Sequence, residues 1–229
     1  MIRTLARPKT LVFTLLFFSA IPILVAGLRL YQIPAGQLPE DAAKFLAVPW
    51  AHFAHALGGV LFGILGPIQF AGVLKFHFRT FHRVIGRIFV GVGMLLALSS
   101  LRLLWQFPEA STWILVSARL AAGLGLGLAL VIAVLAIRGR DVARHKAWMI
   151  RAYAIGMGSA TVSFILFPIY LIRAEPIEGY LSDLVFVASW GTNIAIAEWV
   201  IRGPVTRGPG AGQTGGRLSE AIRNQMAVL

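Results

Sequence analysis

The chain of 229 residues contains no cysteine and few charged side chains. Without cysteine it has no disulfide, no thiolate metal site and no iron–sulfur cluster. Charged residues make up 13% of the chain and hydrophobic residues 58%, whereas soluble domains are about a quarter charged and half apolar. A soluble fold of this length cannot hide so much apolar surface, but a lipid bilayer solvates it directly. The composition therefore indicates an integral membrane protein.

Signatures of catalysis are missing as well. The sequence has no P-loop, no His-Glu-x-x-His zinc-protease motif and no serine in a Gly-x-Ser-x-Gly context. No pair of carboxylates lies within an apolar run, which argues against many ion-coupled pumps. The sequence names no reaction and favours a protein that is not an enzyme, with a redox role left open.

Six apolar runs are long enough to cross a bilayer as helices, which takes about 20 residues each. None shows the two-residue alternation of a transmembrane barrel. The basic N-terminal segment leads into a run longer than the apolar region of a signal peptide, so we expect a retained first span. The predicted spans are Leu11–Leu30, Trp50–Gly72, Gly86–Phe107, Thr112–Ile137, Trp148–Ile172 and Asp183–Ile201.

The predicted fold is an all-α integral membrane bundle of six transmembrane helices, formed by residues 1–202. The tail, residues 203–229, is rich in Gly and Pro, and we expect it to be largely disordered. Of the 21 Lys and Arg residues, 16 fall on one side: before span one, between or just inside spans two and three, between or just inside spans four and five, or after span six. Loops rich in Lys and Arg stay in the cytoplasm, so both termini are predicted to be inside a bacterial inner membrane.

The net charge of +12 is spread between apolar runs. Anionic lipid headgroups on the cytoplasmic face, not nucleic acid, are therefore the expected partner. The two inner loops around His82 and His145 look alike, since each has a His followed by a cation just before a span. Spans two–three and four–five are thus predicted to be parallel copies of one hairpin, forming a four-helix core. Convergence of basic loops under the charge rule is the alternative explanation.

Span two carries a stripe of small and polar residues. At about 100° per residue, His55, Gly59, Gly66 and Gln69 fall on one helix face. Glycine allows a neighbouring backbone to approach closely, so we expect this face to point into the bundle. His55 is then a candidate ligand-binding residue toward the outer side and Gln69 one toward the inner side, although an interfacial His that bonds a neighbour explains His55 equally simply.

Two arginines lie within spans three and four, where a charge costs about 3 kcal/mol at the bilayer centre. They are Arg102 and Arg119, both toward the outer side. With Arg29, His52 and His55 they are predicted to form a cationic pocket that binds an anionic ligand. The alternative is that each arginine extends separately to the interface.

The inner side holds a second set of polar candidates. Glu198 is expected to be neutralised by Arg151 or Arg202, as a structural ion pair. His82 and His145 lie at one predicted depth on different helices, which suits a bis-His haem b, with His55 as a further candidate ligand. Crowding by cations at the interface argues against haem, since such His residues more often make hydrogen bonds.

Four motifs together resemble a known family. They are His55 with Gly66-Pro67-Ile68-Gln69, then His82-Arg83-Val84-Ile85-Gly86-Arg87, then His145 to Tyr153, and finally Trp190-Gly191-Thr192-Asn193 with Glu198-Trp199. The chain from His52 to Trp199 is similar to the bacterial polytopic membrane proteins catalogued as domain of unknown function 2306. The resemblance implies a multi-helix membrane fold with a cluster of polar positions, Asn193 among them, and no established activity.

Three functions follow from these features. The first is binding of a small amphiphile, lipid or quinone between helices, which the glycine-lined faces and inward polar groups favour. The second is electron transfer by a haem held by His82 and His145. The third is transport of a small molecule, which the repeat and Arg119 favour. The sequence does not identify the ligand or the oligomeric state.

Overall fold

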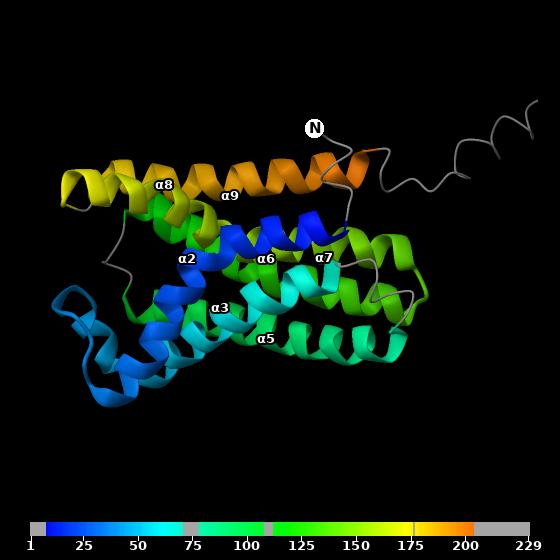
Figure 1. The fold of residues 1–229 in the computed structure, drawn as a ribbon, viewed down its shortest axis with the longest axis horizontal. Helices are drawn as coiled ribbons and strands as arrows, with labels where there is room; N and C mark the ends of the chain where they lie inside the picture. Colours follow the sequence, from blue (N-terminus) through cyan, green and yellow to red (C-terminus); the bar gives the residue numbers. More distant parts are fainter. Residues whose placement is uncertain (1–7, 71–77, 108–111, 176, 204–229) are drawn as a thin grey trace, which may run out of the picture.

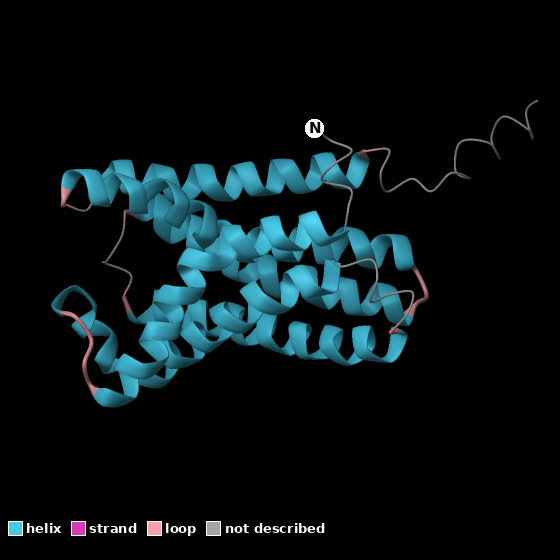
Figure 2. Ribbon diagram, in the orientation of Figure 1, coloured by secondary structure: helices cyan, strands magenta, loops and turns pink. Residues whose placement is uncertain are grey.

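The computed structural model describes residues 8–70, 78–107, 112–175 and 177–203, and nearly all of them are helical, with no strand in these ranges (Figure 2). Six helical segments are long and apolar enough to cross a membrane. The elements are α2 (Pro8–Ala35), the 3₁₀ helix η1 (Glu40–Ala47), α3 (Pro49–Phe70), α5 (Arg79–Gln106), α6 (Trp113–Arg138), α7 (Val142–Gly156), α8 (Gly158–Arg173) and α9 (Gly179–Arg202). The predicted tail lies almost entirely outside the described residues.

All six predicted spans correspond to helices long and apolar enough to cross a membrane, and several of these helices extend past the apolar stretches. The largest extension is at α5, which begins at Arg79, seven residues before the predicted start at Gly86. A helix continues into water as long as its backbone bonds are kept, so the end of an apolar run does not fix the end of the helix. η1 between spans one and two was not predicted.

Span five differs from the prediction of one continuous helix. The chain from Trp148 to Ile172 forms two helices, α7 and α8, that meet at Met157. Two glycines, Gly156 and Gly158, flank the break, and glycine weakens a helix interior by about 1 kcal/mol relative to alanine. Hydropathy is high on both sides of Met157, which hides the break from a search for apolar runs.

The helices surround a buried cluster drawn from α3, α5, α6, α7 and α8, with Phe62, Leu96, Leu130 and Tyr153 among its members. Close approach of helix backbones is visible at Gly58, where an added Cβ would lie 3.2 Å from the Leu96 Cα. α8 and α9 run side by side along one edge, and α2 crosses obliquely over α3 to reach α8 (Figure 1). That the two hairpins are copies of one unit stays a prediction.

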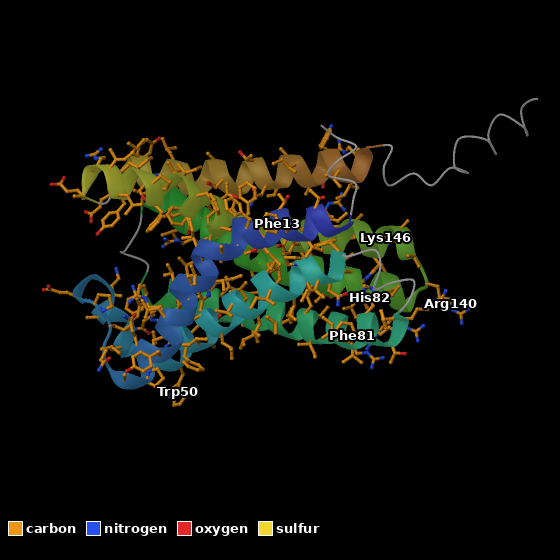
Figure 3. All side chains as sticks on the ribbon, in the orientation of Figure 1. Phe13, Trp50, Phe81, His82, Arg140 and Lys146 are labelled. Carbon is orange, nitrogen blue, oxygen red and sulfur yellow. The ribbon has the colours of Figure 1, made fainter. Side chains whose placement is uncertain are left out.

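The two ends of the bundle carry different residues (Figure 3). At one end, here called the basic end, lie His82, Arg140 and Lys146, with the start of α5 and the α6–α7 turn. The other end, here called the η1 end, carries η1 and three exposed indoles, Trp50, Trp105 and Trp113. Alternation of the loops between the two ends agrees with six crossings, and the assignment of the basic end to the cytoplasm stays a prediction.

Candidate functional site

A cavity of about 490 Å³ lies between the helices, and every α-helix of the described chain contributes to its wall. This volume falls within the range of small-molecule sites. Most of the wall is apolar, with Phe62, Leu96 and Leu126 in its lining. The polar side chains that line it are Ser19, Arg29, His52, His55, Ser100, Arg119, Ser159, Ser163 and Trp190.

The predicted stripe on α3 does face the interior, but its members meet different surroundings. His55 and Gly59 line the cavity, and a Cβ added at Gly59 would meet no atom within 4 Å. At Gly66 a Cβ would clash with the Tyr153 ring. Gln69 is buried and its Nε2 donates to the His82 carbonyl at 3.3 Å. One face of α3 is therefore open at Gly59 and closely packed from Gly66 onward.

Arg119 reaches the cavity from α6. Its guanidinium lies over the Phe186 ring of α9, 5.4 Å from the ring centre, a cation–π arrangement. Asp183, one turn earlier on α9, is close enough to act on Arg119 electrostatically. Asp183 also accepts a hydrogen bond of 3.0 Å from the Thr112 N–H and thereby ties α9 to the start of α6. The ring and the carboxylate hold this cation within an apolar region.

The remaining cations of the predicted pocket divide into two groups. Arg29 and His52 line the same cavity as His55 and Arg119. Arg29 donates to Gln32 Oε1 at 2.8 Å, and the His52 ring packs against Phe45, with 4.6 Å between ring centres. The structure does not bring Arg102 to the cavity, because its side chain is exposed and donates to Gln106 Oε1 at 2.9 Å.

His55 itself packs against α5. Its Nδ1 lies 3.4 Å from the Ser99 hydroxyl, which also donates to the Leu96 carbonyl at 3.1 Å. The ring keeps part of its surface accessible because it lines a cavity and not a packed helix interface. Ser99 thus anchors one ring nitrogen of His55 on the α5 side.

The break in span five borders the cavity, since Ile155, Gly156 and Met157 line it. Ending α7 here takes the Ala154 and Ile155 carbonyls out of the regular helical ladder, and two side chains of α9 bond them. Trp190 Nε1 donates to the Ile155 carbonyl at 3.1 Å, and Asn193 Nδ2 donates to the Ala154 carbonyl at 3.3 Å. Asn193, a candidate from the family motif, therefore donates to a backbone carbonyl at the helix break and does not line the cavity.

At the basic end, Arg151 and Glu198 form the expected ion pair. Arg151 Nε lies 2.5 Å from Glu198 Oε1, and Nη2 donates to Oε2 at 3.0 Å. Arg202 approaches the same carboxylate at 3.5 Å, and the Trp148 ring covers Arg151 with 4.8 Å from Cζ to the ring centre. Each charge has a protein partner, as expected for charged groups on membrane-spanning helices.

The two candidate haem ligands also have contacts at this end. His145 Nδ1 donates to the Ala133 carbonyl at 2.9 Å, across the α6–α7 turn. The His82 backbone carbonyl accepts from Gln69. A His that donates from Nδ1 to a carbonyl keeps Nε2 for another partner. The contact with Ala133 therefore leaves His145 Nε2 available as a metal ligand. Ligation of haem by this pair stays a prediction.

Sequence reasoning missed the apolar cavity residues of α2 and α9, of which Pro22 and Phe186 are examples. Neither is polar, so a search for ionisable groups in apolar runs passes over them. A proline in the middle of a span removes a backbone bond and bends the helix, and Pro22 was the signal available for α2.

Comparison with known proteins gives one match. The sequence model described as "Predicted membrane protein (DUF2306)" matches residues 52–201, about two thirds of the chain. This confirms the resemblance drawn from the motifs between His52 and Trp199. No curated protein and no solved structure matches the chain. The matched segment includes the cavity residues of every helix except α2 and η1.

Proposed function

The chain belongs to the DUF2306 family of predicted membrane proteins, and we propose that it binds a small amphiphile, a lipid or a quinone, in the cavity between its helices. The observation that carries the proposal is the cavity itself, whose wall is apolar over most of its surface and cationic toward one end. Ligand sites typically combine an apolar lining with a few polar groups that fix orientation.

The arginines of the cavity and the ring of Phe62 lie at different depths. Arg29, His55 and Arg119 are each six residues from the end of their helix at the η1 end, or about 9 Å at 1.5 Å per residue. Phe62 is 13 residues into α3, about 20 Å from the same end. A bound amphiphile would have its head group near the η1 end and its chain toward the middle of the bundle.

The lipid phase is the natural source of such a ligand. Val25 of α2 and Ser159 of α8 line the cavity and are also exposed on the bundle surface. Between them α2 and α8 contact each other through Phe18 and Phe164, with 4.9 Å between ring centres. In the proposed setting, a bacterial inner membrane with the basic end in the cytoplasm, the cavity is reached from the outer leaflet.

The test fills the cavity without disturbing packing. Gly59→Leu places a side chain where a Cβ meets open space in the cavity, and Gly91→Leu adds the same side chain at an exposed site on α5. Both proteins are purified from the same membranes, and bound small molecules are extracted and quantified by mass spectrometry. We expect Gly59→Leu to lose an amphiphile that wild type and Gly91→Leu retain. Equal recovery from all three contradicts the proposal.

Transport is the second candidate, and the break in span five is the observation that favours it. Transporters build substrate sites from interrupted helices near the bilayer centre. Here the α7–α8 break at Met157 borders the cavity. A transporter reconstituted in vesicles would accelerate transfer of the retained amphiphile between leaflets, whereas a binding protein would leave the transfer rate at that of lipid alone.

A further inference from the structure

The cavity gathers basic side chains at a common depth. Arg29 of α2, His55 of α3 and Arg119 of α6 come from three helices and each lies six residues from the η1 end of its helix. They are near enough to interact, since Arg29 acts electrostatically on His52, and both His52 and Arg119 act on His55. The fold therefore places two guanidiniums and two imidazoles around one cavity, and guanidiniums among membrane-spanning helices are costly unless they have partners.

Acidic side chains compensate this charge in part. No Asp or Glu lines the cavity among the residues that the structure describes. Asp183, outside the lining, acts on Arg119 and offsets one guanidinium. Arg29 donates to the neutral amide of Gln32. Among the described residues Asp183 thus acts on Arg119, and an anion in the cavity would balance the charge of Arg29.

The hydrogen-bond donors of the cavity also favour an anionic ligand. The guanidinium group carries five N–H donors in a planar fork that suits a carboxylate or a phosphate. His52 Nδ1 is buried and makes no hydrogen bond within the described residues. The hydroxyl groups of Ser19, Ser100 and Ser163 already donate to carbonyls of their own helices. The strong donors are therefore at the η1 end, where the acceptors of a ligand would be placed.

We propose that the ligand of this cavity is an acyl chain with an anionic head group, bound with the head group at Arg119, Arg29 and His52 and the chain against Phe62. This inference rests on the proposed function, which would also admit neutral amphiphiles and quinones. The shared chemistry is a carboxylate or phosphodiester anion on an apolar chain, from a fatty acid or from a phospholipid.

The experiment compares ligands that differ only in charge. Binding of oleate and of its methyl ester to delipidated protein in neutral detergent is measured by calorimetry, with phosphatidylglycerol as a third ligand. A charge-assisted contact with a guanidinium predicts that oleate binds about tenfold or more tightly than methyl oleate. Competition by phosphatidylglycerol identifies a phospholipid source, and oleate binding without such competition identifies a free fatty acid; both support the inference.

Variants separate the head-group site from the fold. Arg119→Gln should reduce the preference for oleate over its ester about tenfold, and Arg119→Lys should retain most of it. If Arg119→Gln does not fold, His52→Gln and Arg29→Gln test the same end of the cavity. Equal affinity for oleate and methyl oleate overturns the anionic head group and leaves the amphiphile site standing. If neither ligand binds wild type more than Gly59→Leu, the proposed function itself fails.

Discussion

The two halves of this bundle surround their polar side chains differently. In the half toward the basic end, the polar contacts of Arg151 with Glu198 and of Gln69 with the His82 carbonyl lie outside the cavity. In the half toward the η1 end, Arg29, His52, His55 and Arg119 border a cavity of about 490 Å³. Polar groups in both halves need partners, because lipid offers them no hydrogen bonds.

The difference distinguishes polar side chains that stabilise the fold from polar side chains that are placed to bind a ligand. A pair such as Arg151–Glu198 is complete within the protein, and its loss should affect folding first. Groups around a cavity have room for an external partner, and their loss should affect binding first. The comparison therefore predicts that substitutions in the two halves have separable effects on stability and on ligand binding.

The strongest contrast is between two glycines on the same face of α3. Gly66→Ala should destabilise the protein by about 1–3 kcal/mol, because its Cβ clashes with the Tyr153 ring. That ring packs between Phe62 and Phe70 and has little room to move. Gly59→Ala should stay within about 1 kcal/mol of wild type, since its Cβ meets open space. Unfolding in mixed detergent–SDS micelles measures both, and equal destabilisation would remove the distinction between the halves.

The next effect is at the ion pair. Glu198→Gln removes the charge that Arg151 contacts through two nitrogens and leaves a cation without its counterion. Because both side chains keep about a quarter of their surface exposed, solvent and lipid headgroups soften the loss, and we expect about 1.5–3 kcal/mol. The same unfolding assay reports it, while oleate affinity in the folded fraction should match wild type. A loss of affinity without a loss of stability would place Glu198 in the binding machinery.

Much of this architecture was readable from the sequence. The six spans and the Arg151–Glu198 pair follow from apolar run length and from the cost of an isolated charge in lipid. The cavity does not follow, because Gly59 and Gly66 look identical in a helical pattern. Whether a glycine faces a ring or a void depends on a residue about 90 positions away, Tyr153, and on how far α2 tilts. The periodicity of the sequence predicts neither the position of Tyr153 nor the tilt of α2.

A smaller effect is expected at the broken helix. Asn193→Ala removes the donor to the Ala154 carbonyl and the acceptor of the Thr161 hydroxyl. Hydrogen bonds between membrane helices contribute about 0.6 kcal/mol on average and at most about 1.7, so stability should fall by an amount in that range. Hydrogen exchange at Ala160 and Thr161, whose N–H groups donate to the Met157 carbonyl at the break, should rise in the same variant. Unchanged exchange would mean that α9 does not stabilise the break.

The smallest effect is expected at the arginine that the structure leaves outside the cavity. Arg102→Gln breaks an exposed contact with Gln106, so the free energy of unfolding should change by no more than about 0.5 kcal/mol. Its oleate affinity should equal that of wild type, in contrast to Arg119→Gln, although both substitutions remove one positive charge from neighbouring spans toward the same end. If Arg102→Gln weakens oleate binding as much as Arg119→Gln does, the general positive potential of the η1 end attracts the anion, and the cavity adds no selectivity of its own.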